Sequence, residues 1–193
     1  MTTAERETLD IDVLFVGAGP ASLAGAYHLA KLLADHNARA ASGARLELSI
    51  AVLEKGSEVG AHGLSGAIVD PRSLRELFPD KFSAIPFEAE VGREHLWWLT
   101  QEKAISLPEP PPLKNHGNYV ASLGKLVKWM AKEVEALGVD IFCEFPGRTL
   151  LYEDSAAGPG RRVAGVRTGD KGIGKDGKRK ANFEPGVDIR SQM

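Results

Sequence analysis

The segment DVLFVGAGPASLAG, residues 12–25, sets the expectation for the fold of this chain. It holds a short apolar run, Val13–Val16, followed by a Gly-Ala-Gly turn at residues 17–19. Apolar residues then recur at helical spacing from Ala21 to Leu33. This order predicts a buried β-strand, a tight turn and an α-helix. Such a turn lets a phosphate group approach the backbone at the positive end of a helix.

Gly17 and Gly19 occupy the first two positions of the G-x-G-x-x-G dinucleotide-binding fingerprint, and Ser22 stands at the third. One glycine permits the turn, and the other lets a diphosphate approach the backbone. A second apolar run, Leu46–Leu53, predicts the next parallel strand, and Glu54 follows it directly. We expect Glu54 to accept hydrogen bonds from ribose hydroxyls. The alternative is a glycine turn with a purely structural role.

The rest of the pattern predicts further helices and strands. Asp70 followed by proline favours a short helix over Pro71–Phe78. Two apolar segments around a polar stretch predict a hairpin over residues 96–107. Apolar residues at helical spacing predict an amphipathic helix from Leu123 to Leu137, which Gly138 would cap. Strands are predicted at 139–143, 148–153, 162–168 and 187–190, the last three as an antiparallel meander.

Composition and charge argue against several classes of protein. The chain has 193 residues with 24 Lys and Arg against 26 Asp and Glu, so its net charge of −2 gives no electrostatic reason to expect nucleic acid as a partner. No apolar run approaches the roughly 18 residues needed to cross a bilayer, and no secretory signal peptide is visible. Cys143 is the only cysteine, so the chain can neither form an internal disulfide nor supply the thiolates of an iron–sulfur cluster.

Three longer segments carry a family resemblance: GSEVGAHGLSGAIVDPRSLRELFPD (56–80), NHGNYVASLGKLVKWMAKEVEALGVDIF (115–142) and GVRTGDKGIGKDGKRKANFEPGVDIR (165–190). In amino-acid sequence and in order along the chain, they resemble the amino-terminal part of electron-transfer flavoprotein:ubiquinone oxidoreductases. The resemblance is closer to the bacterial than to the mitochondrial members. The resemblance covers roughly residues 11–190. The Ala-His-x-Leu-Ser-Gly and Asn-His-Gly-Asn-Tyr motifs argue against related flavoproteins such as the geranylgeranyl reductases.

The resemblance implies an α/β fold: a Rossmann-like, FAD-binding, three-layer fold with a parallel sheet and an antiparallel β-meander, here truncated. Residues 1–193 are then expected to form an incomplete FAD-binding domain. Its parts are a βαβ nucleotide unit at 11–55, a flavin-proximal loop with candidate membrane-facing segments at 56–112, and a helix with the meander at 113–193. The family's quinone and iron–sulfur domains are expected to be absent from this chain.

FAD is the cofactor that the resemblance implies. The alternative to a role near the flavin is that His62 is an ordinary loop histidine. For Ser65 and Gly66, the alternative is that they only form a turn. No catalytic side chain is expected, because the flavin carries the redox chemistry. The positions that match the family's cofactor-binding motifs are Gly17, Gly19, Pro20 and Ala21 at the diphosphate, Glu54 and Lys55 at the adenosine, and His62, Leu64, Ser65 and Gly66 near the flavin.

The family passes electrons from reduced electron-transfer flavoprotein to ubiquinone, using FAD and a [4Fe-4S] cluster. The resemblance therefore implies an electron-transferring-flavoprotein dehydrogenase with those two partners. It also implies peripheral contact with the cytoplasmic face of the bacterial inner membrane. Tryptophan suits a membrane interface, so the hairpin at 96–107, with Trp97 and Trp98, and the segment at 59–80 are the candidates for this contact. Packing within the domain is the alternative.

Other functions and simpler roles stay open. The chain could be an inactive FAD-binding module or a flavoprotein of the geranylgeranyl reductase type. An NAD-dependent Rossmann dehydrogenase would leave the His62 and Asn115 motifs as coincidences. We expect the asparagines and His116 of Asn115–Asn118 to order a loop, Lys171–Lys180 to form a solvated loop, and Cys143 to be a small buried apolar residue.

Overall fold

The structure is a computed structural model that describes residues 6–41, 43–154, 160–174 and 176–193. The chain forms two compact units. Unit 1 comprises the residues up to His62 together with Met130–Met193, and unit 2 comprises Gly63–Trp129. Helix α3 (Leu123–Glu135) contributes residues to both units.

The predicted βαβ unit is confirmed in unit 1. Strands β2 (Val13–Val16), β3 (Ile50–Leu53) and β9 (Asp140–Phe142) form a parallel sheet in the order β2-β3-β9. The central strand β3 is buried along its length, with no residue more than 5% exposed. Helix α1 (Pro20–Arg39) connects β2 to β3 and packs against both strands. An apolar strand between two parallel neighbours explains this continuous burial.

Helix α1 is longer than predicted, and β3 is shorter. The helix continues through polar residues to Arg39, and β3 begins at Ile50 rather than at Leu46. The Asn37 side chain explains the later start, because it accepts a hydrogen bond from the Leu46 amide and donates one to the Leu46 carbonyl, each at 2.8 Å. The backbone of Leu46 is therefore bonded to the end of the helix and not to a neighbouring strand.

The predicted meander is also confirmed. Strands β10 (Gly147–Asp154), β11 (Arg161–Thr168) and β14 (Asp188–Ser191) pair antiparallel in sequence order. A fourth strand that was not predicted, β1 (Thr8–Ile11), adds in parallel to β14. Three of its four residues are exposed and only Ile11 is buried, so this short strand depends on its pairing with β14.

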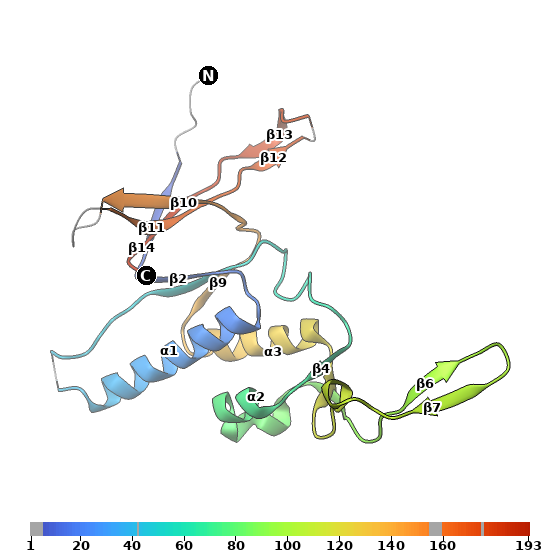
Figure 1. Cartoon of the computed structure of the whole chain (residues 1–193). Coiled ribbons are helices and arrows are strands. Elements are labelled where there is room, and N and C mark those ends of the chain that lie inside the picture. The colour runs from blue at the N-terminus through green and yellow to red at the C-terminus, as the bar shows by residue number, and fades with distance from the viewer. Residues whose placement is uncertain (1–5, 42, 155–159, 175) are drawn as a thin grey trace. The chain divides into compact units, whose positions relative to one another are not determined.

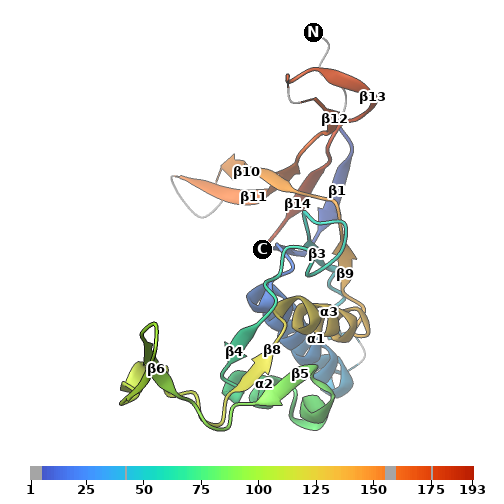
Figure 2. The ribbon, with the colours of Figure 1, turned by 90° about the vertical axis from the view of Figure 1, so that its right-hand side faces the viewer.

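Unit 1 has the predicted layers, which Figures 1 and 2 show from two sides: the antiparallel sheet, the parallel sheet, and the helices. A cluster of buried residues joins the two sheets, with Ile11 and Ile189 from the antiparallel sheet and Ala51 and Leu53 from β3. Leu14, Phe142, Phe145 and Val187 pack against this cluster. Burial of apolar side chains from both sheets is the main stabilisation of this layered arrangement.

The prediction of a solvated loop at Lys171–Lys180 is wrong, because the segment contains paired strands. Its described residues are largely exposed, but β12 (Lys171–Ile173) and β13 (Arg179–Glu184) pair as an antiparallel hairpin. A turn closes it: Gly177 has φ +77°, and the Asp176 side chain accepts a hydrogen bond from the Lys178 amide at 3.1 Å. Position 175 within the run lies outside the described residues. Turn chemistry at Asp-Gly therefore outweighs the low apolar content of the two strands.

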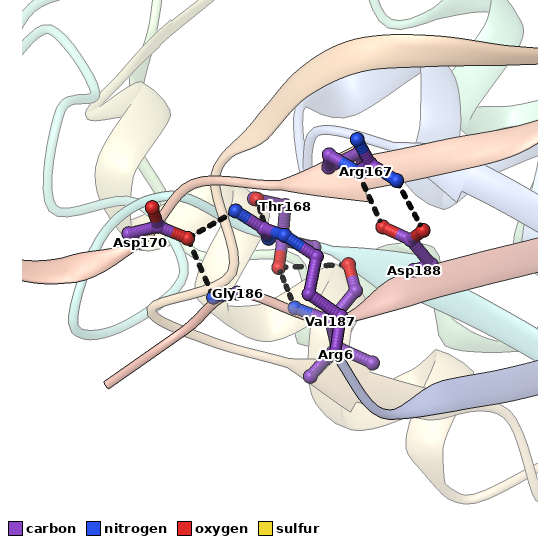
Figure 3. A network of polar contacts seen from close by, with 7 residues as sticks. All are labelled: Arg6, Arg167, Thr168, Asp170, Gly186, Val187 and Asp188. Atoms are coloured by element: carbon purple, nitrogen blue, oxygen red, sulfur yellow. Dashed lines mark hydrogen bonds and ion pairs between the residues drawn. The ribbon is translucent and has the colours of Figure 1, made fainter. Parts of the chain in front are cut away.

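A polar network holds together the base of this hairpin, where β11 ends and β14 begins (Figure 3). Asp170 accepts hydrogen bonds from the Arg6 guanidinium and, at 2.9 Å, from the Gly186 amide. The buried Thr168 hydroxyl accepts a bond from the Val187 amide at 2.7 Å. These bonds satisfy the buried polar groups at the point where the chain leaves one sheet for the hairpin.

Gly186 is the position in this network where a side chain does not fit. A Cβ atom there would lie 2.3 Å from the Thr168 carbonyl oxygen. We expect Gly186→Ala to lower the free energy of unfolding by about 1–3 kcal/mol, because backbone must move to relieve the overlap. Urea denaturation followed by circular dichroism measures the change. Gly92→Ala is the matched control, because a Cβ at Gly92 meets no atom within 4 Å. Equal stability of the two variants would contradict this account.

Unit 2 is built on a second antiparallel sheet. Strand β8 (Tyr119–Ala121) lies between β4 (Ala67–Val69) and β5 (Phe87–Glu90). The short helix predicted after Asp70 is confirmed as α2 (Arg72–Leu77), and the Asp70 side chain accepts a hydrogen bond from the Arg72 amide at 3.0 Å. Two 3-10 helices complete the unit, η1 (Pro79–Ala84) and η2 (Pro111–Leu113).

The predicted hairpin is confirmed as β6 (Leu96–Leu99) paired antiparallel with β7 (Ala104–Leu107). The two strands form a sheet of their own, and most of their apolar side chains are exposed. The amphipathic helix is also confirmed as α3, which ends at Glu135, and Gly138 follows it with φ +83°. The predicted last apolar position, Leu137, lies beyond the helix and is 39% exposed.

Candidate nucleotide-binding site

The turn after β2 has an open outer surface. Gly17 has φ +97°, a left-handed conformation that disfavours any side chain, and its amide donates a hydrogen bond to the Leu53 carbonyl at 2.7 Å. A Cβ at Gly17 or at Gly19 would meet no atom within 4 Å. The glycines are therefore not required by packing of the protein against itself, and both leave backbone accessible to a ligand.

The turn leads into the N-terminus of α1. Gly19 is the N-cap, Pro20 is the first helical residue, and the Leu23 amide donates to the Gly19 carbonyl at 3.0 Å. The amides of Ala21 and Ser22 precede this first intrahelical bond, so they have no acceptor within the helix. The first turn of α1 carries neither a side-chain cap nor an acidic residue. These free donors and the helix dipole together favour an anion.

Glu54 lies at the end of β3 and contacts the glycine turn. Its Oε2 accepts a hydrogen bond from the Ala18 amide at 3.1 Å, and its Oε1 accepts one from the Gly56 amide at 2.7 Å. The side chain is 13% exposed. An ionised carboxylate has about four acceptor positions, so two bonds leave capacity for ligand hydroxyls. The acid predicted from the sequence is thus bonded to the turn that it was expected to accompany.

The other predicted positions divide between the two units. Lys55 and His62 belong to unit 1 and are exposed, and the His62 Nδ1 lies 4.0 Å from the Glu54 Oε1. Leu64, Ser65 and Gly66 belong to unit 2 and are also exposed. The Leu64 carbonyl accepts a hydrogen bond from the Leu123 amide at 3.0 Å, and Gly66 has φ +87°. The structure therefore brings the glycine turn, Glu54 and His62 together within one unit.

Two residues near Glu54 were not predicted as part of the site. A Cβ at Gly56 would lie 3.1 Å from both the Glu54 Oε1 and the Glu58 carbonyl oxygen, so glycine is needed for close packing there. Cys143 was predicted as a small buried residue of a strand, but it follows the end of β9 and is only half-buried. Burial, and next the negative charge of Glu54, raise the pKa of the Cys143 thiol above its ordinary value of 9.0. The sequence signal for Gly56 is its place two residues after the acid.

Cys143 can report on the charge of Glu54. We expect slow alkylation by iodoacetamide at neutral pH that accelerates at a pH above about 9, because the thiolate is the reactive form. Glu54→Gln removes one cause of the raised pKa, so the midpoint of the rate–pH profile should move to lower pH. Mass spectrometry of the alkylated chain gives the rates, and Glu47→Gln at an exposed position is the control. Superimposable profiles for the wild type and Glu54→Gln would contradict the expectation.

A cavity of about 340 Å³ lies elsewhere in unit 1, at the base of the β12–β13 hairpin. Phe145, Thr168, Lys171 and Val187 are among its lining residues, and none of the predicted cofactor positions is. Among the residues that the structure describes, no group of three or more His, Cys, Asp or Glu side chains could hold a metal ion.

Comparison with known proteins finds curated relatives along nearly the whole chain. No family model matches the chain. The electron transfer flavoprotein-ubiquinone oxidoreductase of Oryza sativa subsp. japonica is 44% identical over 97% of the chain, and the mitochondrial protein of Bos taurus is 38% identical over 98%. A probable oxidoreductase of the same name from Acinetobacter baylyi is 41% identical over 100%. The chain is a relative of the amino-terminal part of these oxidoreductases.

The resemblance found in the sequence motifs is therefore confirmed. The chain spans about 30% of the length of the curated electron transfer flavoprotein-ubiquinone oxidoreductases that it matches. Identity does not place it nearer to the bacterial members, since the rice mitochondrial relative is 44% identical and the Acinetobacter relative 41%.

Solved structures confirm the fold class. A geranylgeranyl bacteriochlorophyll reductase-like protein from Thermoplasma acidophilum superposes with a TM-score of 0.58 at 20% identity, covering 96% of this chain and 38% of that one. The myxobacterial chondrochloren halogenase, a variant of FAD-dependent halogenases, gives a TM-score of 0.55 at 14% identity, covering 95% and 36%. At these identities the likeness concerns the fold, which is the mixed α/β fold of flavoproteins with parallel and antiparallel strands.

Proposed function

We propose that this chain is the FAD-binding part of an oxidoreductase that passes electrons from reduced electron transfer flavoprotein to ubiquinone. The names of the relatives support the two partners. The observation that carries the proposal is the open glycine turn at the N-terminus of α1, hydrogen-bonded to a carboxylate at the end of β3. Because the chain spans about 30% of these relatives, the complete reaction is proposed for a protein that also contains their remaining regions.

The described residues fit a flavin dinucleotide. The amides of Ala21 and Ser22 would bind the diphosphate, because they lie at the start of α1 beside glycines without side chains. Glu54 would accept hydrogen bonds from the ribose hydroxyls. By resemblance, Lys55 would lie at the adenosine, and His62 with Leu64–Gly66 near the flavin. When bound, FAD supplies the electron-transfer chemistry, and the chain's own residues bind and orient it.

The fit does not extend to an iron–sulfur cluster. Such clusters are held by several cysteine thiolates, and this chain has a single cysteine, Cys143. Any cluster in the proposed electron path must therefore take its ligands from residues outside this sequence.

Gly19→Val tests the cofactor site. The backbone at Gly19 is extended, with φ −82°, and its Cβ would lie in open space, so we expect the variant to fold like the wild type. The added side chain would cover the backbone that the diphosphate approaches, and FAD affinity should fall at least about tenfold. Titration of the FAD-free protein, followed by quenching of flavin fluorescence, measures the affinity, with Gly92→Ala as control. Undiminished FAD binding by Gly19→Val would contradict the site, and preference for NAD over FAD would contradict the cofactor.

A narrower function is an FAD-binding module without quinone reduction. The observation that favours it is the single cysteine, Cys143, which cannot supply the thiolates of an iron–sulfur cluster. The two functions differ in one assay, in which the FAD-loaded chain receives reduced electron transfer flavoprotein and a soluble ubiquinone analogue. Quinone reduction supports the complete activity, whereas FAD binding without turnover supports the module.

Peripheral membrane contact is the second part of the proposal, and the β6–β7 hairpin is its candidate. No helix among the described residues is long and apolar enough to cross a membrane. Leu96, Trp98, Ile105 and Leu107 pair on one face of the hairpin, and Trp98 is 63% exposed. The opposite face carries Trp97 and Leu99, which are also exposed. Exposed tryptophans on an apolar hairpin suit the interface between acyl chains and headgroups.

The second candidate segment for membrane contact, residues 59–80, contains both exposed and buried apolar side chains. Leu64 is 71% exposed and Ile68 50%, whereas Leu74 and Phe78 are buried in the core of unit 2. The Phe78 ring packs edge-on against Trp129 with ring centroids 4.8 Å apart. The helical half of this segment is therefore core, and the hairpin carries the proposal.

Replacing both hairpin tryptophans tests the membrane contact. We expect Trp97→Ser with Trp98→Ser to reduce co-sedimentation with phosphatidylcholine–phosphatidylglycerol vesicles at least about fivefold, because the interfacial aromatic area is lost. Tyr152→Ser is the matched control, since Tyr152 is an aromatic residue of unit 1 that is 47% exposed. Equal vesicle binding by the double variant and the wild type would contradict the proposal.

A further inference from the structure

Glu54 follows β3 and is hydrogen-bonded to the ends or following segments of the two other parallel strands, β2 and β9. The Ala18 amide, after β2, donates to the Glu54 Oε2 at 3.1 Å. The Glu54 amide donates to the Phe142 carbonyl at the end of β9 at 2.8 Å, and the Phe145 amide donates to the Glu54 carbonyl at 2.9 Å. The Gly56 carbonyl accepts a hydrogen bond from the Glu144 amide at 2.8 Å.

The Glu54 carboxylate accepts two further hydrogen bonds, which depend on the identity of the side chain. One oxygen serves the glycine turn and the other serves Gly56, and the carboxylate is 13% exposed. Bonds to an ionised acceptor in such a place are stronger than neutral ones. A Cβ at Gly56 would come within 3.1 Å of the Glu54 Oε1, so this contact is tightly packed from both sides.

We infer that Glu54 is a positioning residue that couples the diphosphate turn to residues 56–62 before any ligand binds. Its Oε2 holds the Ala18 amide, so the donors left for an anion are the later amides of the turn and of the first turn of α1. Its Oε1 holds Gly56, the first residue of the segment that leads to His62. The role that this gives Glu54 in cofactor binding rests on the proposed function, but the coupling itself does not.

The coupling also has a consequence for ligand binding. Ribose hydroxyls would bind the carboxylate that already orders both segments. A change at residues 56–62 therefore alters the geometry presented by the turn, although residues 56–62 and the turn are bonded to different oxygens of Glu54. Binding of a dinucleotide should in turn protect the two segments together.

Amide hydrogen exchange of the FAD-free protein, measured by NMR, tests the inference. Glutamine has the shape of glutamate but one acceptor oxygen, and its NH₂ group would face a backbone donor. We expect Glu54→Gln to speed exchange at Ala18, Gly56 or both by about tenfold or more, with Val52 in the buried strand β3 unchanged. Glu47→Gln, at an exposed position, should exchange like the wild type. Unchanged exchange at both Ala18 and Gly56 in Glu54→Gln would overturn the inference.

Gly56→Ala provides a second test if Glu54→Gln does not fold. The new Cβ presses on the Glu54 Oε1 and not on the glycine turn, so faster exchange at Ala18 shows the coupling, and unchanged exchange there overturns it. FAD titration separates this inference from the proposed function. Faster exchange in a protein that does not bind FAD rejects the function and supports the coupling. Weaker FAD binding by Glu54→Gln with wild-type exchange supports the function and rejects the coupling.

Discussion

Parallel pairing around β3 is the constraint on which the candidate site depends. β3 lies between β2 and β9, so three strands end at one edge of the same sheet. In open α/β sheets, ligands bind beyond the carboxyl ends of the strands. In this protein the segments beyond those ends are hydrogen-bonded to one another through Glu54. Moving β2 relative to β3 would separate the glycine turn from the carboxylate beside it.

The site divides its backbone donors between the protein and the expected ligand. The Gly17 amide bonds to Leu53 and the Ala18 amide to Glu54, so both serve the protein's own structure. The amides of Ala21 and Ser22 lack an acceptor within α1 and lie at its positive end. An anion is favoured there and ligand hydroxyls are favoured at Glu54. This pattern of charge and hydrogen bonding suits the adenosine diphosphate group of the proposed cofactor.

The hydrophobic pattern alone did not distinguish buried strands from exposed ones. Ile50–Leu53 and Leu96–Leu99 are both continuous apolar runs of four residues, yet Ala51 and Val52 are fully buried while Trp98 is 63% exposed. The first run has parallel neighbours on both sides, whereas the second pairs with one strand in a sheet of its own. β1 shows the opposite case, because only Ile11 of its four residues is buried and the strand exists through its pairing with β14.

The sequence by itself determined the βαβ unit, the amphipathic helix, the meander and the two glycines of the turn, because each follows from local periodicity or from a backbone conformation that glycine permits. It also predicted Glu54 as the acid that accompanies the glycine turn, and the structure bonds the Glu54 carboxylate to the Ala18 amide of that turn. The tertiary structure decided which atoms Glu54 contacts, since Ala18 and Gly56 meet its two oxygens only when the strands are paired. It also decided that Asn37 binds the backbone of Leu46, so that β3 begins only at Ile50, and that the basic run at β12–β13 forms a hairpin. Those outcomes depend on contacts between residues distant in sequence or on turn hydrogen bonds, which compositional patterns do not record.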